Sequence, residues 1–415
     1  MKLSSTLPAP RLHQPKNRSA TRLDQLDPAA LTRQLDEFQA GHYGRIARTW
    51  EAIERRDDVV QSVAGKRKAA AAQHGWEIIT LDDSPEALAH RDALTYFYHH
   101  LTAVNGVEED ERGGFQLLAR QMMDSAGKRF AVHEIVWQPT TVNGQRRLKA
   151  EFRFVPLWFF ENRSGQLRFL AKDGQREGVP LSPGEWMVTV GPGVMEACSV
   201  AYLFKHKPLQ DWLLYCERNG TPGVRGVTDA RPGSPEWNAA RDAVLHFGAE
   251  FQALMSRGTE IEAIDLGVKG TLPYPELVER MDRAIVVLWR GADLSTLSRD
   301  GGVGVSLQIE EPDLIAEADA QTLSEVLNTQ VNRFLIDHLF QAEPRAYLQV
   351  RAGKQRNLAR DLQVYRTAWE MGLPISEAEF RAHFGLPSLP TGATRLPPPP
   401  SHRTALLKAA ENGPA

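Results

Sequence analysis

The sequence has few cysteines, no long hydrophobic segment and no recognisable secretory signal. Its two cysteines, Cys198 and Cys216, are too few for a disulfide framework. The longest strongly hydrophobic run, AIVVLW at 284–289, is far shorter than the roughly 20 residues that a membrane-spanning helix needs. The first residues lack the hydrophobic core of a signal peptide. We therefore expect a soluble chain that is made in a reducing cytoplasm and has no membrane partner.

The chain also lacks a strong excess of charge of either sign. Its 415 residues include 49 Lys and Arg and 52 Asp and Glu, which gives a formal net charge of −3. A general nucleic-acid-binding protein carries a basic surface field, so contact with a polyanion would have to come from local patches here. The length suits roughly two to three ordinary domains or one elongated, multi-part fold.

Catalytic and metal-binding motifs are missing as well. AGKRKAA at 64–70 has Arg after its Lys, whereas a P-loop needs Ser or Thr there. GGVGVS at 301–306 fits neither a dinucleotide-binding motif nor a nucleophile elbow. HEIVW at 133–137 lacks the second His of a zinc protease. We predict no enzyme activity, no cofactor and no metal, with one alternative left open: carboxylates that converge from several segments for two-metal chemistry.

The N-terminal half predicts helices followed by strands. The first 23 residues hold five basic residues and no acid before Asp24, which predicts a flexible basic arm. A helix follows, with Asp27 as its N-cap, Pro28 in its first turn and hydrophobic residues at helical spacing. Between about 129 and 190 the pattern alternates, and Asn143–Gly144 is a hairpin turn signal. Helices before a small antiparallel sheet indicate an α+β fold.

The C-terminal half predicts long helices. A helix near 207–218 has a hydrophobic stripe that includes Leu209, Trp212 and Cys216, and Asn219–Gly220 should end it. After the connector TPGVRGVTDARPGS, the segment 235–258 predicts a helix with a hydrophobic stripe over more than five turns. IEAIDLG predicts a short strand, and two more long helices follow it. The proline-rich end predicts a linker or a disordered tail.

Several segments in the same order resemble the Mu-like portal family of tailed phages, long known as a domain of unknown function. They are RRDDVVQSVAGKRKAAAAQHGWEI, KHKPLQDWLLYCERNGTPGVRG, YPELVERMDRAIVVLWRGADLSTLSRDGGVGVSLQ and AEADAQTLSEVLNTQVNRFLIDHLF. The resemblance covers roughly residues 27–385. The sequence departs from the family in ADLSTLSRDGG, where a longer polar run is expected.

The resemblance implies a portal fold with an N-terminal α/β wing, a two-helix stem, a short β clip and a helical crown. The implied divisions are a flexible basic arm at 1–26, the wing at 27–204, a stem helix at 205–220, a clip connector at 221–234, a second stem helix at 235–258, a returning wing strand, helix and channel loop at 259–312, a crown at 313–385 and a proline-rich tail at 386–415. The strand IEAIDLG is also a candidate for the clip.

The resemblance further implies a structural protein that forms a ring of about twelve copies at one capsid vertex, assembled in the host cytoplasm. Double-stranded DNA would pass through its channel without sequence specificity, and the partners would be the terminase large subunit, the major capsid protein and a head–tail adaptor. The alternatives are a nucleic-acid enzyme or packaging-motor component, and a monomeric head-completion adaptor. Mass and ring-shaped particles distinguish these classes.

Candidate residues follow from the same resemblance. The candidates for DNA contact in the channel are Arg290, Arg299, Lys205 and Lys207, with solvation or ion pairing as the alternative role. The candidates for the clip and for partner docking are Thr221, Val224 and Arg225. Val224 and Arg225 would pair as a strand with neighbouring clips, or else lie in an unpaired loop.

Overall fold

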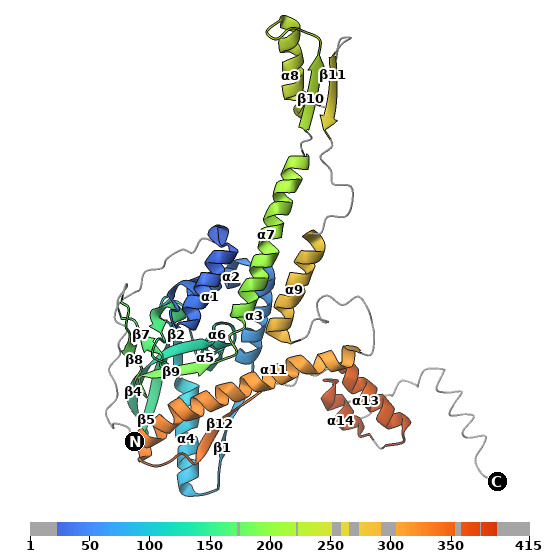
Figure 1. The fold of residues 1–415 in the computed structure, drawn as a ribbon. Coiled ribbons are helices and arrows are strands. Elements are labelled where there is room, and N and C mark those ends of the chain that lie inside the picture. Colours follow the sequence, from blue (N-terminus) through green and yellow to red (C-terminus); the bar gives the residue numbers. More distant parts are fainter. Residues whose placement is uncertain are drawn as a thin grey trace, which may run out of the picture. The chain divides into compact units, whose positions relative to one another are not determined.

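The computed structural model describes residues 23–171, 175–220, 223–250, 259–264, 274–291, 304–352, 358–373 and 375–387 (Figure 1). The chain divides into two compact units, Met1–Gly353 and Lys354–Ala415. No helix in the described part of the chain is long and apolar enough to cross a membrane. The expected arm, channel loop and tail lie mostly or wholly outside the described residues.

The first unit begins with a run of helices, some of which have side-chain N-caps. They are η1 (Leu23–Gln25), α1 (Pro28–Gln39), α2 (Gly44–Arg56), α3 (Asp58–Ala72), α4 (Pro85–His100), α5 (Phe115–Met122) and α6 (Asp124–Lys128). The predicted N-cap is confirmed, because Asp27 Oδ1 accepts a hydrogen bond from the Ala30 N–H at 2.7 Å. Asp57 caps α3 in the same way through the Val60 N–H at 2.8 Å.

These helices pack against a sheet with strand order β3-β2-β5-β4-β9. Its strands are β2 (Thr102–Asn105), β3 (Arg112–Gly113), β4 (Phe130–Val142), β5 (Gln145–Val155) and β9 (Trp186–Val190). The predicted hairpin is confirmed: β4 and β5 pair antiparallel around Asn143 and Gly144, whose φ angles are 52° and 76°. The sheet is not purely antiparallel as expected, because β2 runs parallel to β5. Next to it lie η2 (Leu157–Phe159) and a small sheet of β6 (Phe160–Glu161), β7 (Arg168–Phe169) and β8 (Val179–Pro180).

A later part of the chain returns to the same core. It consists of α11 (Gly304–Leu327), the π-helical turn η3 (Asn328–Asn332), α12 (Arg333–Phe340) and β12 (Ala346–Arg351), which pairs antiparallel with β1 (Gly75–Thr80). Leu323, Leu327 and Phe334 belong to the hydrophobic core that also holds Trp50 and Phe152. The prediction of one helical crown over 313–385 is therefore wrong for 313–352, because this stretch buries its hydrophobic side chains in the first unit.

Two long helices carry the middle of the chain. α7 spans Met195–Gly220 and α9 spans Tyr274–Arg290, and the two pack along each other (Figure 1). α7 ends where Asn219–Gly220 predicted, but it begins ten residues earlier than the expected start at 205 and contains Pro208 in its interior. Its N-terminal turns are kept helical by burial of Met195, Cys198 and Leu203 in the core.

The described part of the segment between these helices forms a small structure of its own. β10 (Gly223–Thr228) pairs antiparallel with β11 (Thr259–Ile264), and α8 (Pro235–Glu250) packs on β10. The expectation that 235–258 forms the second stem helix is wrong for its described part, because α8 covers the hairpin while α9 lies along α7. The described part of IEAIDLG belongs to β11, which pairs with the connector strand β10, and its assignment to the clip stays a prediction.

The second unit is a small helical module. α13 (Leu358–Glu370) and α14 (Glu377–His383) pack through aromatic rings, with the Tyr365 and Phe380 centroids 5.4 Å apart. His383 Nε2 lies 2.8 Å from Asp361 Oδ2, which adds a polar link between the two helices.

Candidate functional site

The α7–α9 pair is antiparallel and joined at both ends. Trp212 of α7 and Tyr274 at the start of α9 have near-parallel rings with centroids 6.4 Å apart. Trp289, near the end of α9, is fully buried beside Gly127, where a Cβ would approach both the Trp289 ring and Met195 of α7. The pair is therefore fixed to the core at the N-terminal end of α7.

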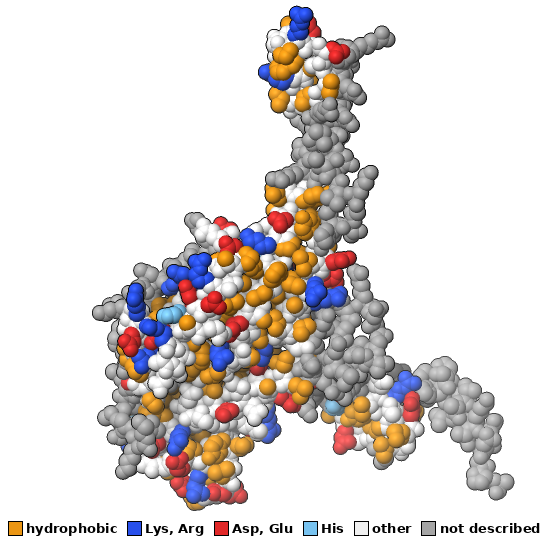
Figure 2. Space-filling model, viewed as in Figure 1, with side chains coloured by type: hydrophobic (Ala, Val, Ile, Leu, Met, Phe, Trp, Pro, Cys, Tyr) orange, Lys and Arg blue, Asp and Glu red, His pale blue; other side chains and the backbone are white. Residues whose placement is uncertain are grey.

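The same helix pair exposes an unusual amount of hydrophobic surface. Phe204, Leu213 and Leu214 on α7 are 56%, 63% and 44% exposed, and Val200 and Val287 are also exposed. Figure 2 shows hydrophobic side chains gathered along these helices. Extended apolar surface of this kind marks an interaction site in a water-soluble protein.

Lys205 joins α7 to two other elements. Its Nζ lies 2.7 Å from Asp282 Oδ1 on α9, 2.9 Å from Asp58 Oδ1 and 3.0 Å from Asp57 Oδ2 at the start of α3. Lys205 is only 4% exposed. Burial would lower the pKa of its ammonium, but the three carboxylates raise the pKa instead. One buried cation thus fixes the positions of α7, α9 and the α2–α3 junction relative to one another.

His206 reinforces this cluster on the next residue of α7. Its Nε2 lies 2.9 Å from Asp57 Oδ2, and the Asp57 side chain is fully buried. Burial would raise the pKa of Asp57, but hydrogen bonds from His206 and the Val60 N–H, with the charge of Lys205, lower it to about 2. Asp57 is therefore ionised throughout the neutral range and remains a partner for Lys205.

Arg67 connects α3 to α11 through a bidentate ion pair and to α9 through a further hydrogen bond. Arg67 of α3 donates to Asp319 of α11 through Nε at 2.9 Å and Nη2 at 2.8 Å. Its Nη1 also donates to the Trp289 carbonyl oxygen at the end of α9, at 3.3 Å. The fork geometry of the guanidinium suits this arrangement, which a lysine could not reproduce.

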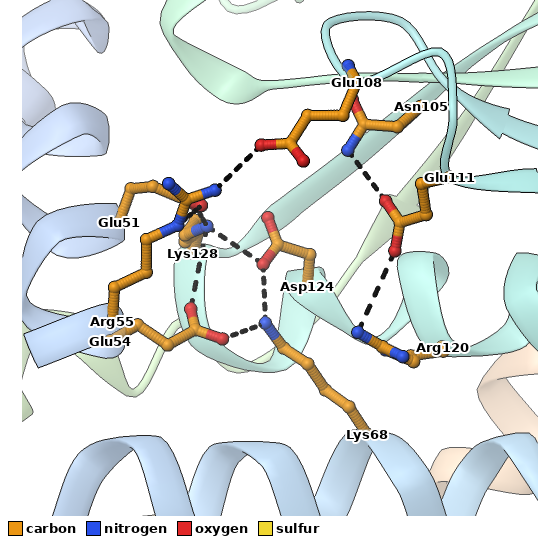
Figure 3. A network of polar contacts seen from close by, with 10 residues as sticks. All are labelled: Glu51, Glu54, Arg55, Lys68, Asn105, Glu108, Glu111, Arg120, Asp124 and Lys128. Carbon is orange, nitrogen blue, oxygen red and sulfur yellow. Dashed lines mark hydrogen bonds and ion pairs between the residues drawn. The ribbon is translucent and has the colours of Figure 1, made fainter. Parts of the chain in front are cut away.

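A second buried network holds α2, α3 and α6 together (Figure 3). Lys68 pairs with Glu54 and, at 2.9 Å, with Asp124, while Lys128 pairs with Glu51 at 2.5 Å and with Asp124 at 3.0 Å. Burial would raise the pKa of Asp124, but Lys128 and Lys68 lower it to about 2. Every ion of the network faces an opposite charge, so loss of one member would leave a buried charge without its counter-charge.

The acidic segment VEEDERGG at 107–114 contacts this framework at the surface. Glu108 accepts from Arg55 at 3.2 Å, and Glu111 accepts from Asn105 at 2.9 Å (Figure 3). These contacts are largely exposed, so they contribute little compared with the buried pairs.

Three amide side chains at the π-helical turn η3 close the edges of two sheets. Gln330 accepts from the Val188 N–H and donates to the Val188 carbonyl oxygen, both at 2.8 Å. Asn328 does the same for Leu348 of β12, at 2.9 Å and 2.8 Å. Asn332 donates to Asn328 at 2.7 Å and accepts from the Tyr98 hydroxyl at 2.7 Å. Gln330 and Asn328 thus each take the place of a neighbouring strand, which protects an edge that would otherwise pair with another chain, and Asn332 holds Asn328 in position.

β10 and α8 line a small, open apolar pocket of about 230 Å³ that includes Val227, Trp237, Val244 and Leu245. Arg241 places its guanidinium carbon 6.0 Å from the Trp237 ring centroid. Gly226 allows the close approach of α8, because a Cβ there would collide with Val244 Cγ2.

The predicted channel residues are not brought together. The prediction that Lys205 faces a DNA channel is wrong, because its ammonium is buried and held by three carboxylates of its own chain. Lys207 is bonded only weakly, to Gln210 at 3.3 Å, and Arg290 is half-buried in the last turn of α9. Both stay predictions, and Arg299 lies outside the described residues.

The predicted clip residues fall on the hairpin. Val224 and Arg225 belong to β10, opposite Ala263 and Glu262 of β11, so this segment is a strand paired within its own chain. Pairing with a neighbouring copy stays a prediction. Thr221 lies outside the described residues. The described residues contain no cluster of three or more His, Cys, Asp or Glu that could hold a metal ion.

The fold is similar to that of a neck chain in a gene transfer agent particle. A chain in the structure titled "Neck of empty GTA particle computed with C6 symmetry", from a gene transfer agent, has a TM-score of 0.51 and 11% identity, and the match covers 86% of this chain and 94% of that one. A neck chain of the native particle gives 0.48 and 13%, covering 86% and 100%. A HK97-family phage portal protein from Corynebacterium diphtheriae gives 0.37 and 11%, covering 74% and 95%. No curated protein matches the sequence.

The sequence gives the family. The family described as the portal protein of Mu bacteriophage matches residues 47–386, which is most of the chain. The chain therefore belongs to this family and is a structural portal protein of a tailed phage. The predicted resemblance and the α+β portal fold are confirmed.

Proposed function

We propose that the chain assembles into a ring of about twelve copies at one capsid vertex, through which double-stranded DNA is packaged and ejected. The observation that carries this proposal is the exposed hydrophobic surface of the α7–α9 pair. The titles of the similar structures, which describe neck assemblies with cyclic symmetry, support it.

The exposed residues of α7 suit a ring better than a two-fold dimer. At about 100° per residue, Val200, Phe204 and Leu214 fall within about 80° of one another, whereas Leu213 points about 140° away from the middle of that face. A closed ring joins two different surfaces of each subunit, while a two-fold dimer uses one surface twice. Two exposed apolar faces on one helix provide the two surfaces.

The parts of the chain take the roles that the family implies. We assign the core of the first unit to the wing, α7 and α9 to the stem, β10, α8 and β11 to the clip, and the second unit to the crown. The clip would dock the head–tail adaptor and the terminase large subunit, with Thr221, Val224 and Arg225 as candidate contacts, and the wing would meet the major capsid protein. The formal charge of −3 suits a conduit along which DNA slides, because many phosphate contacts would hold it tightly.

Negative-stain electron microscopy of the purified full chain tests the proposal. We expect ring-shaped particles with a central hole from the wild type. Phe204→Asp places a charge on one apolar face of α7 and should abolish rings while leaving the circular dichroism spectrum unchanged. Leu81→Asp is the matched control, since Leu81 is 66% exposed away from the helix pair, and it should form rings. Rings from Phe204→Asp would contradict the assigned surface.

A nucleic-acid enzyme is the alternative from another class. Metal-dependent nicking of DNA that one carboxylate substitution abolishes would favour it. A wild-type chain that stays monomeric under all assembly conditions, including with the partner proteins, would contradict the ring and favour the head-completion adaptor.

A further inference from the structure

The outer half of the β4–β5 hairpin carries basic side chains and no acidic one. Residues 135–150 include Arg146, Arg147 and Lys149 but no Asp or Glu, in a chain where acids outnumber bases. Within the described part of the chain, none of these three cations forms an ion pair, and Arg147 donates only to Gln145, at 2.7 Å. The next acid along β5, Glu151, is engaged by Arg153 at 2.7 Å. The positive charge of this surface is therefore uncompensated locally.

This half of the hairpin is a two-stranded ribbon. β9 pairs with β4 only as far as Glu134, and β2 pairs with β5 only from Glu151 onward. Thr141 and Thr140 stand opposite Arg146 and Arg147 in the register and add hydroxyl groups beside the cations. Hydroxyl and basic side chains supply most contacts to DNA phosphates, and a two-stranded ribbon has a width that DNA grooves accept.

An aromatic platform from α4 holds two of the cations in place. The Tyr96 ring centroid lies 5.8 Å from Arg147 Cζ and 5.9 Å from Lys149 Nζ. His100 stacks on the same ring at 4.0 Å, and its Nδ1 lies 2.7 Å from the Tyr96 carbonyl oxygen. A cation–π contact orients a cation without neutralising it, whereas a carboxylate partner would cancel the charge. The N–H donors stay available to an anion.

We propose that this basic ribbon, defined by Arg146, Arg147, Lys149 and Tyr96, binds the sugar–phosphate backbone of double-stranded DNA without sequence specificity. It deepens the proposed function and rests on it, because it assigns a DNA contact outside the channel candidates. DNA is the occupant because the cations are unpaired and accompanied by hydroxyl groups on both faces of the hairpin. Arg147 and Lys149 share one face with Thr140, and Arg146 shares the other with Thr141, so the hairpin presents basic and hydroxyl groups to phosphates on both sides.

Fluorescence anisotropy of a short duplex of mixed sequence, measured across about 50 to 200 mM salt with the full chain, tests the inference. The triple variant Arg146→Gln, Arg147→Gln, Lys149→Gln should reduce the slope of log K against log salt by about 2.7, since each phosphate contact contributes about 0.9. The control Arg45→Gln, Arg333→Gln, Arg366→Gln removes the same charge from arginines that are 68%, 60% and 75% exposed, and its slope should stay at the wild-type value.

Substitutions at Tyr96 test whether DNA binding depends on the arrangement of the cations or only on the net charge. Tyr96→Leu leaves the net charge unchanged and should weaken DNA binding about two- to fivefold by releasing the two cations, while Tyr96→Phe keeps the ring and should bind as the wild type does. Equal slopes for the two triple variants would overturn the inference. A triple variant that loses only binding to a poly-glutamate peptide, with its DNA slope unchanged, would assign the ribbon to an acidic protein segment and also overturn it.

Ring formation is scored separately by electron microscopy of every variant. Rings together with equal slopes overturn the DNA contact alone and leave the proposed function standing. A wild-type chain without rings contradicts the proposed function whatever its DNA slope.

Discussion

Removal of the Lys205 ammonium should destabilise the first unit more than any comparable change at the surface of α7. Lys205→Met keeps most of the buried hydrocarbon stem and removes the cation that Asp57, Asp58 and Asp282 share. Three carboxylates then face one another without a counter-charge, two of them largely shielded from water. Loss of one partner from a buried ion pair costs about 3–5 kcal/mol, and we expect this substitution to fall in that range.

Lys207→Met is the matched control on the same helix. Lys207 is half-buried, and within the described residues its ammonium donates to Gln210 Oε1 at 3.3 Å and faces no carboxylate, so its removal should change the free energy of unfolding by no more than about 0.5 kcal/mol. Urea unfolding near neutral pH, followed by far-ultraviolet circular dichroism, measures both variants. Asp57 is ionised at this pH, because its pKa in the folded chain is about 2, below the ordinary 3.8. The stability that the ionised Asp57 contributes is lost only as the pH falls from about 3.8 to about 2.

A double variant tests the cause of the effect. Lys205→Met with Asp282→Asn should be less destabilised than the sum of the two single changes, by about 1–3 kcal/mol, because the second change removes one of the orphaned charges. Additive effects, or a Lys205→Met chain as stable as the Lys207→Met control, would refute the role of Lys205 as the link between α7, α9 and α3.

Three further predictions follow from individual contacts. Burial lowers the pKa of His133 from the ordinary 6.5 to about 3, so between these two values only the unfolded chain binds the proton, and the free energy of unfolding falls as the pH falls. His133→Phe should therefore reduce the stability that is lost between about pH 7 and pH 5 by about 2 kcal/mol, measured by urea titration at each pH. An unchanged loss would exclude His133 as its origin. Gly226→Ala should place a Cβ against Val244 and lower the local stability of the β10–β11 sheet by about 1–3 kcal/mol. Faster amide hydrogen exchange in β11 would show this loss, and an unchanged exchange rate would contradict the close packing. Gln330→Ala should unpair both backbone groups of Val188 at a cost of about 1–3 kcal/mol in thermal unfolding, and a neutral result would mean that water replaces the amide.

Local chemistry predicted the parts of the fold that depend on neighbours in sequence. Asp27 and Pro28 begin α1 because a side-chain oxygen and a fixed φ suit a first helical turn. Asn143–Gly144 forms the β4–β5 turn because both residues take positive φ. The end of α7 at Gly220 follows from the same kind of signal.

The parts that sequence reasoning missed depend on distant partners. α7 continues through Lys205 and Pro208 because buried residues on α9 and α3 surround it, and no local pattern records those partners. β12 pairs with β1, which lies about 270 residues earlier in the sequence. The short alternation of hydrophobic and polar residues in β12 could therefore not be assigned to a strand from its neighbours in sequence. Asn328 and Gln330 carry no local sequence signal of their role, and only the approach of two strand edges reveals their bonds.

The candidate site was predicted in outline and not in its residues. The family resemblance gave the long helices and the short β segment, but it could not tell that Lys205 would be neutralised inside the fold. It also assigned the second stem helix to 235–258, because the hydrophobic stripe of α8 carries no mark of whether it faces a helix or a hairpin.

The mass of the assembled wild-type chain tests the central claim most directly. A ring of about twelve copies of a 46.3 kDa chain has a mass of about 560 kDa, and mass photometry with the native protein should show a peak near that value. A chain that remains at 46.3 kDa, alone and with its capsid and terminase partners, would contradict the claim that this protein is the ring at the vertex.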